Sequence, residues 1–246
     1  MRILEDGGKL LEATQRYKLA VVVGAGFVGL ETAAALRRRG LEVAVVELLP
    51  QILDGVLDPE LASEVQKHME EMGIRFFLNS GLREIRGKDR VEGVLAGEQE
   101  LPCEMVVVAA GVRANIQLAR DAGIEVIEKP PAVKVDDRME TSARGVYAAG
   151  DCVICPSHAI AGLPWLSQLG TVAVRQGKVA GTNAAGGDAR FPPVLGTCVS
   201  KIFDIEIAST GLTESYAKKL GIDCVLSLIH ISEPTRPRLI SYAVFC

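Results

Sequence analysis

The sequence contains no apolar run that reaches the roughly 18 residues needed to span a bilayer. Residues 1–9 are polar and acidic, unlike the apolar core of a secretory signal peptide. Six cysteines in 246 residues are too sparse for a secreted disulfide scaffold. These absences predict a cytoplasmic protein that has no membrane partner.

Long blocks of like charge are absent as well. The formal net charge is −4 and the charges are spread along the chain, so we expect no nucleic-acid partner. Aromatic residues make up only 4% of the chain, whereas glycine, alanine, valine and leucine are plentiful. This bias is typical of parallel strands that are buried on both faces and packed against helices, so it favours an α/β fold.

The hydrophobic pattern predicts a βαβ unit near the start of the chain. Residues 19–23 form a short apolar run that ends in a glycine cluster, and the alanine-rich residues 28–39 have the pattern of a helix. Gly40 is expected to end that helix, and residues 43–46 form a second β-branched run that closes at Glu47.

Further elements are expected along the chain. Asp58, Pro59 and Glu60 are typical of a helix start, with a capping carboxylate and a proline at the first helical position, and this helix should stop near Gly73. The other expected elements are strands at residues 74–78, 82–85, 91–95, 105–110, 133–135 and 146–149, and a helix at residues 168–184.

The glycine cluster has the spacing GxGxxG, formed by Gly24, Gly26 and Gly29 between a strand and a helix. The first glycine permits a tight turn, the second lets the backbone approach a pyrophosphate, and the third lets helix and strand pack closely. The helix N-terminus then supplies N–H donors to the phosphates. The pattern predicts a dinucleotide site, and the alternative is that these glycines only form a turn.

Glu47 adds a second feature of such a site. It ends the second strand 23 positions after Gly24, where a carboxylate can accept hydrogen bonds from both hydroxyls of the adenosine ribose. A carboxylate there repels a 2′-phosphate, and Leu48 and Leu49 follow it where an NADP enzyme would have an arginine. We therefore expect the site to bind NAD(H) in preference to NADP(H).

Two stretches resemble the motifs of the pyridine nucleotide-disulfide oxidoreductases: residues 21–31, VVVGAGFVGLE, and residues 141–152, TSARGVYAAGDC. The resemblance implies FAD as a second cofactor, because in that family the second motif returns the chain to the flavin domain. There Asp151 would hydrogen-bond a ribityl hydroxyl and Gly150 would keep the backbone close. Considered alone, Asp151 could equally mark a turn at the end of a strand.

Other stretches extend the resemblance. Residues 106–115, which end in GVRAN and include Gly111, resemble the strand and crossover that leave the NAD domain, although Ala114 stands where the family often has proline. Residues 168–181 resemble the helix whose N-terminus, at Thr171, points at the flavin and can stabilise negative charge there. Residues 196–221 resemble the opening of the interface domain in the branch of NADH oxidases, NADH peroxidases and coenzyme A-disulfide reductases.

Two residues of the first motif acquire roles by position. Phe27 stands where the family often has an aromatic side chain that covers the flavin until nicotinamide displaces it. Glu31 stands where a glutamate commonly pairs with a lysine beside flavin N5. The alternatives are that Phe27 belongs to the core and that Glu31 is an ordinary helix charge.

The resemblance implies a Rossmann-like NAD-binding domain inserted in a two-part FAD-binding domain. It assigns residues 1–115 to the NAD(H)-binding domain, residues 116–190 to the second half of the FAD-binding domain, and residues 191–225 to the start of a dimerisation domain. The family's separate FAD fingerprint and its redox cysteine are not found in this sequence. The implied parent protein is a homodimeric flavoprotein that passes hydride from NADH to FAD and on to a small-molecule acceptor: a disulfide, a cysteine sulfenate or oxygen.

Some features leave other interpretations open. The chain could be a non-catalytic NAD-binding module or an inert truncation product. Cys152, Cys155 and His158 form a CxxCxxH that could be redox-active or half of a zinc site, but no second ligand pair is evident and we predict no metal. Residues 226–246 match nothing in the family and resemble translated adapter or vector sequence, with a natural divergent end as the alternative.

Overall fold

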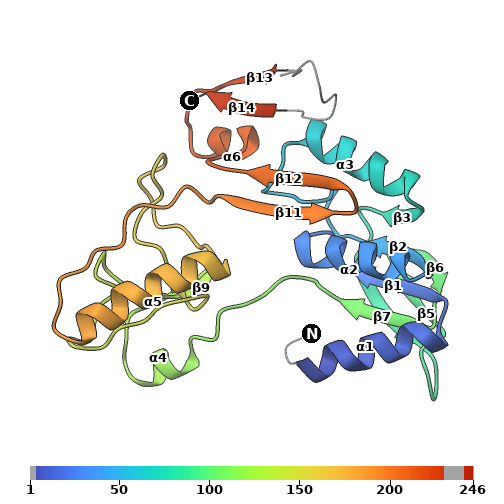
Figure 1. Ribbon diagram of the computed structural model, residues 1–246, viewed down its shortest axis with the longest axis horizontal. Helices are drawn as coiled ribbons and strands as arrows, with labels where there is room; N and C mark the ends of the chain where they lie inside the picture. Colours follow the sequence, from blue (N-terminus) through green and yellow to red (C-terminus); the bar gives the residue numbers. More distant parts are fainter. Residues whose placement is uncertain (1–3, 230–240, 246) are drawn as a thin grey trace. The chain divides into compact units, whose positions relative to one another are not determined.

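The computed structural model describes residues 4–229 and 241–245 and divides the chain into two compact units (Figure 1). The first unit comprises Met1–Gly111 and Val199–Ile207, and the second comprises Val112–Cys198 and Ala208–Cys246. No helix within these described residues is both long enough and apolar enough to cross a bilayer.

The first unit is built on a parallel sheet of four strands in the order β3-β2-β1-β7. The strands are β1 (Leu19–Val23), β2 (Glu42–Val46), β3 (Ile74–Phe77) and β7 (Met105–Val108). Central β1 and β2 read as continuous apolar runs because both of their faces are covered, and nine of their ten residues are buried or half-buried. The βαβ unit predicted from the sequence is confirmed.

One face of this sheet is covered by helices. The first unit contains α1 (Leu4–Arg16), α2 (Phe27–Arg38) and α3 (Pro59–Glu71). Helix α2 buries small residues such as Ala33 and Ala34 in the same core cluster as Val22 and Val45. Asp58 is the N-cap of α3, as expected, but its side chain does not make the capping hydrogen bond that the sequence suggested.

The other face is covered by an antiparallel sheet of three strands, β4 (Leu82–Arg86), β5 (Gly93–Ala96) and β6 (Gln99–Pro102). Val94 and Leu101 of this sheet share a core cluster with Val21 and Val46. The hairpin of β4 and β5 was expected from the sequence. Strand β6 was not expected from the sequence. Only Leu101 of its four residues is buried, and the strand ends in a proline.

A hairpin from late in the chain completes the core of the first unit. Strands β11 (Cys198–Ile202) and β12 (Ile205–Ser209) pair with each other (Figure 1). The residues around its tip, Ile202, Phe203 and Ile207, are 0–5% exposed and lie in the core cluster that contains α2. The first unit is therefore not continuous in sequence, because Val199–Ile207 joins Met1–Gly111.

The second unit contains a three-stranded sheet in the order β10-β9-β8 and three helices. The strands are β8 (Val126–Glu128), β9 (Pro131–Lys134) and β10 (Val153–Ile154), and the helices are α4 (Gln117–Asp121), α5 (Gly170–Ala184) and α6 (Glu214–Lys219). Val133, Met139 and Val153 are buried in its core, where Val172 of α5 packs against them. The helix expected at residues 168–184 is confirmed by α5.

The strand expected at residues 146–149 was wrong. Tyr147 makes only an isolated bridge to Glu140, and all four residues are exposed or half-buried. No strand of the described residues lies alongside this segment.

Further along, β13 (Val225–Ile229) and β14 (Ser241–Phe245) pair antiparallel with each other, within the stretch that resembles adapter sequence.

Candidate functional site

The turn between β1 and α2 requires glycine at two positions. Gly24 has φ of +104°, and a Cβ atom there would lie 2.4 Å from the carbonyl oxygen of Ala109. A Cβ atom on Gly29 would lie 1.9 Å from the carbonyl oxygen of Gly24. These close approaches let the turn pass between β7 and α2, so both glycines are explained by the fold.

Gly26 is different, because nothing lies within 4 Å of the place where its Cβ atom would be. Its backbone is extended, with φ of −77° and ψ of 178°, so other residues could adopt it. Helix α2 begins at the next residue with no side-chain cap and no acidic residue in its first turn. The N–H groups of this helix end and the positive end of its dipole therefore remain suited to an anion, and Gly26 leaves room for it.

Glu47 lies at the carboxyl end of β2, beside this turn. Its Oε2 accepts a hydrogen bond from the Ala25 N–H at 2.7 Å, and its Oε1 accepts one from the Leu49 N–H at 2.9 Å. A carboxylate has about four acceptor positions, so each oxygen keeps one for a further donor. The structure thus brings the three motif glycines and Glu47 together and fixes the orientation of the carboxylate.

Phe27 and Glu31 lie on the first turns of α2. Phe27 is half-buried and packs against the core cluster of the first unit, so the core alternative for this residue has a direct basis. The carboxylate of Glu31 accepts a hydrogen bond from the hydroxyl of Ser200, on β11. The sequence gave no sign of this bond, because Ser200 is 169 residues away along the chain.

Gly111 ends the first unit, just beyond β7. Its φ of +93° is a left-handed conformation that glycine adopts without strain, and no atom lies within 4 Å of the position of a Cβ. Its position agrees with an exit from the NAD domain, and its contribution to cofactor binding stays a prediction.

In the second unit, Gly150 has φ of +90°, and its N–H donates to Oε1 of Gln176 at 2.8 Å. Gln176 is fully buried on α5, so this bond ties the Gly150–Asp151 turn to that helix. The side chain of Asp151 is exposed. Sequence reasoning missed Gln176, although a buried amide in a helix needs partners and can be suspected for that reason.

Thr171 is the second residue of α5 and is exposed. The helix begins after Leu169, with no side-chain cap and no acidic residue in its first turn. Its positive end is therefore not neutralised by its own side chains, which is the property that the flavin assignment needs.

The CxxCxxH stretch is structural. Cys155 is buried and its Sγ accepts a hydrogen bond from Gln176 at 3.3 Å, while His158 is buried with Nδ1 accepting two backbone N–H groups of the following turn. Burial raises the pKa of the Cys152 and Cys155 thiols and lowers the pKa of His158. Over residues 4–229 and 241–245, no three His, Cys, Asp or Glu side chains are grouped to hold a metal ion.

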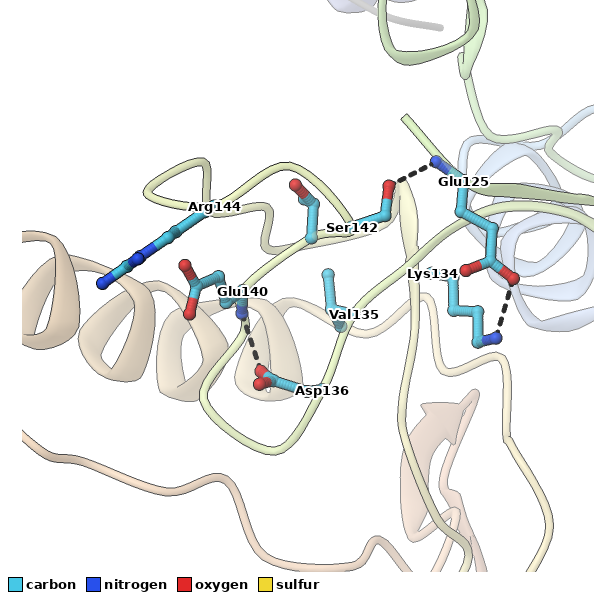
Figure 2. Close-up of a pocket in the computed structure, with 8 residues that line it drawn as sticks. Glu125, Lys134, Val135, Asp136, Glu140, Ser142 and Arg144 are labelled. Carbon is cyan, nitrogen blue, oxygen red and sulfur yellow. Dashed lines mark hydrogen bonds and ion pairs between the residues drawn. The ribbon is translucent and has the colours of Figure 1, made fainter. Parts of the chain in front are cut away.

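Figure 2 shows a pocket of about 540 Å³ in the second unit. Its carboxylates already have partners: Glu125 pairs with Lys134 at 2.7 Å, and Asp136 accepts from the backbone N–H of Glu140. None of the site residues predicted from the sequence lines it. The lining residues are Glu125, Lys134, Val135, Asp136, Glu140, Thr141, Ser142 and Arg144.

Comparison with known proteins decides the family. Residues 1–177 match the family model described as pyridine nucleotide-disulphide oxidoreductase. The chain belongs to this family. The predicted family and the predicted α/β fold are confirmed, and the predicted cofactors, NAD(H) and FAD, are those of such oxidoreductases.

Several relatives are similar over most of the chain. An NADH oxidase of Methanocaldococcus jannaschii is 46% identical over 228 residues, which are 92% of this chain and 50% of that protein. A CoA-dependent NAD(P)H sulfur oxidoreductase of Pyrococcus abyssi is 37% identical over 90% of this chain and 49% of that protein. The chain thus spans about half the length of these curated relatives.

Solved structures agree. An NAD-dependent persulfide reductase from A. fulgidus superposes with a TM-score of 0.88 at 36% identity, over 92% of this chain and 42% of that one. An FAD-dependent pyridine nucleotide-disulphide oxidoreductase from Desulfovibrio vulgaris gives a TM-score of 0.85 at 35% identity, over 93% of this chain and 58% of that one.

Proposed function

We propose that this chain is the NAD(H)-binding part, together with the second half of the FAD site, of an FAD-dependent NADH oxidoreductase. The observation that carries the proposal is the arrangement of Gly26, the uncapped start of α2 and the carboxylate of Glu47 at one edge of a parallel sheet. Ligands of open α/β sheets bind at the carboxyl ends of the strands, which is where these groups lie.

The groups of the first unit fit a dinucleotide in two places. A pyrophosphate would lie over Gly26, where a Cβ atom would otherwise project, and would accept from the first N–H groups of α2. The adenosine ribose would donate its two hydroxyls to Glu47. A phosphate on the 2′ oxygen would meet that carboxylate instead, so NAD(H) should be preferred to NADP(H).

The second unit fits the flavin side. Gly150 and Asp151 form a turn held by Gln176, with an exposed carboxylate for a ribityl hydroxyl. The uncapped N-terminus of α5 at Thr171 would favour negative charge on the flavin. When bound, FAD supplies the chemistry of accepting hydride from NADH and passing electrons on.

The finer parts of the function rest on the relatives. Their names are NADH oxidase and CoA-dependent NAD(P)H sulfur oxidoreductase, and we propose oxygen, a disulfide or a cysteine sulfenate as the acceptor. Four of the five described thiols, Cys103, Cys152, Cys155 and Cys198, have a pKa raised by burial, so none of these four suits the reactive thiolate of such an enzyme. We also propose a cytoplasmic homodimer for the complete protein.

Titration of the purified chain with NADH and NADPH tests the nucleotide assignment. We expect saturable NADH binding, followed by cofactor fluorescence, and weaker NADPH binding. Failure to bind NADH would contradict the proposal, and equal affinities would contradict the role of Glu47.

A second experiment tests the flavin assignment. The chain alone should purify colourless and should not oxidise NADH with oxygen, peroxide or disulfides, because a pyrophosphate cradle for FAD needs a second glycine turn. Co-expression with the first half of the M. jannaschii relative should restore a yellow colour, and Asp151→Ala should then weaken flavin retention. If the chain alone retains stoichiometric FAD and oxidises NADH, a complete flavin site lies within these residues. If the chain binds NADH but shows no turnover, either alone or co-expressed, it is a non-catalytic module.

A further inference from the structure

Leu53 has an unusual backbone conformation for its surroundings. Its φ is +51°, in the left-handed region, and its side chain is only 2% exposed. A non-glycine residue in this region is uncommon, and a buried leucine there is strained. In this conformation its N–H donates to the carbonyl oxygen of Ala25 at 2.9 Å, in the middle of the glycine-rich turn.

The segment that carries Leu53 is held from several sides. Ile52 is completely buried and Leu57 is 6% exposed, both in the core cluster of the first unit. The carbonyl oxygen of Leu53 accepts from the N–H groups of Val56 and Leu57. Strain of this kind persists only where the surroundings enforce it, and it is commonly found at functional sites.

The bond to Ala25 has a consequence for the next peptide group. A trans peptide is planar, so its C=O and N–H point in opposite directions. Because Leu53 draws the Ala25 carbonyl toward itself, the Gly26 N–H must point the other way. Gly26 is exposed and nothing lies within 4 Å of the place where its Cβ atom would be, so an exposed backbone with room beside it carries this N–H.

The preceding peptide group is held as well, because the Ala25 N–H donates to Glu47 at 2.7 Å. Ala25 is completely buried, so water does not compete for either bond. Both peptides that flank Ala25 are therefore oriented before any ligand arrives.

We propose that Leu53 is a positioning residue for the dinucleotide-binding turn: its strained backbone orients the Gly26 N–H for the pyrophosphate of NADH. The inference rests on the proposed NAD(H) site. According to this inference, the strained backbone of Leu53 increases the affinity for NADH. A residue that served packing alone would not affect that affinity.

Two substitutions at this position separate the roles. Glycine adopts φ of +51° without strain, so Leu53→Gly should keep the bond to Ala25 although it loses the side chain. Alanine loses nearly the same side chain but relaxes toward negative φ, which removes the bond. We expect Leu53→Ala to bind NADH about threefold to tenfold more weakly than Leu53→Gly, the effect of one lost hydrogen bond.

The controls use the same titration together with thermal unfolding. Met69→Ala removes a completely buried side chain of the same cluster, on α3, and it should lower the thermal midpoint while leaving NADH affinity within about twofold of wild type. An ester bond in place of the Leu53 amide keeps the side chain and removes only the donor, and it should reproduce the weaker binding of Leu53→Ala even if that variant folds poorly.

The outcomes are distinct. Weaker NADH binding in Leu53→Ala than in Leu53→Gly, at comparable stability, supports the inference. If wild type binds NADH but the two variants bind equally, or the glycine variant binds more weakly, Leu53 acts through packing and the inference alone is wrong. If wild type binds no NADH, the proposed function is overturned and this inference with it.

Discussion

Glu47→Gln is a substitution that separates the charge of this side chain from its shape. In the wild type, each carboxylate oxygen accepts one backbone N–H, from Ala25 or from Leu49. A glutamine has one acceptor oxygen and one donor nitrogen, so it can accept only one of these N–H groups. The other N–H then faces a donor, and the carboxamide no longer presents two acceptors to the ribose.

The size of the effect follows from these bonds. A hydrogen bond to a charged group contributes about 1.5–3 kcal/mol, and the lower value is appropriate because Glu47 is half-exposed. For NADH, losing one such bond to a ribose hydroxyl and loosening the turn should raise Kd about 10- to 100-fold, the equivalent of about 1.4–2.8 kcal/mol. NADPH should lose less, because the repulsion of its 2′-phosphate is relieved at the same time.

The assay is a pair of fluorescence titrations, with NADH and with NADPH, on wild type, Glu47→Gln and Glu47→Arg. The ratio of the NADPH Kd to the NADH Kd should fall in Glu47→Gln. In Glu47→Arg this ratio should drop below one, so that NADPH binds more tightly than NADH. Leu48→Gln is a matched control, since this neighbouring side chain is 69% exposed and carries no charge to lose. If Glu47→Gln leaves both the NADH affinity and the ratio unchanged, the assigned role of the carboxylate is wrong.

Four further outcomes are expected. Gly26→Ala should stay within about 1 kcal/mol of wild-type stability while NADH affinity falls at least about tenfold. Gly24→Ala should lower both stability and affinity, because its Cβ atom would meet backbone. Equal effects of the two substitutions would contradict the assignment of Gly26 to the pyrophosphate. Phe203→Ala should destabilise the first unit by about 3–5 kcal/mol in denaturant unfolding, since this ring is 3% exposed in its core, and a loss below about 1 kcal/mol would show that the hairpin is dispensable. Burial lowers the folded-state pKa of His158, so stability is fully present above the unfolded-state pKa and is lost as pH falls below it; the thermal midpoint should drop as pH falls below about 6.5, and less so in His158→Gln. Deleting residues 226–246 should leave the midpoint nearly unchanged because the strands there pair with each other, and a drop of more than about 5 °C would show that they support the fold.

The glycine turn between β1 and α2 could be predicted from the sequence because its requirements are local. Gly24 and Gly29 are explained by backbone that passes within 3 Å of their missing Cβ atoms, and only glycine permits this. Glu47 follows directly from its place at the end of β2. At each of these positions, the residue type and its spacing from the neighbouring strands and helix are enough to predict where it lies in the turn.

Contacts between distant segments could not be predicted in this way. Leu53 acts through its backbone N–H and a φ of +51°, and nothing in the identity of a leucine indicates either. The sequence around Phe203 did not show that a hairpin tip there is buried in the first unit. Its burial beside α2 depends on residues that lie more than 160 positions earlier, such as Arg38, which donates to the Phe203 carbonyl.

The wrong strand at residues 146–149 has a more specific cause. Valine and tyrosine have a strand's preference, but that preference describes how side chains fit a pleated surface and not whether a neighbouring strand is present. Backbone N–H and C=O groups must pair, and here they bond locally: the Val146 carbonyl accepts from the Thr141 N–H at 2.8 Å and the Ala148 N–H donates to the Met139 carbonyl at 3.1 Å, which makes an isolated bridge and no longer ladder. The local sequence is therefore that of a strand, although this segment joins none of the sheets that the described residues form.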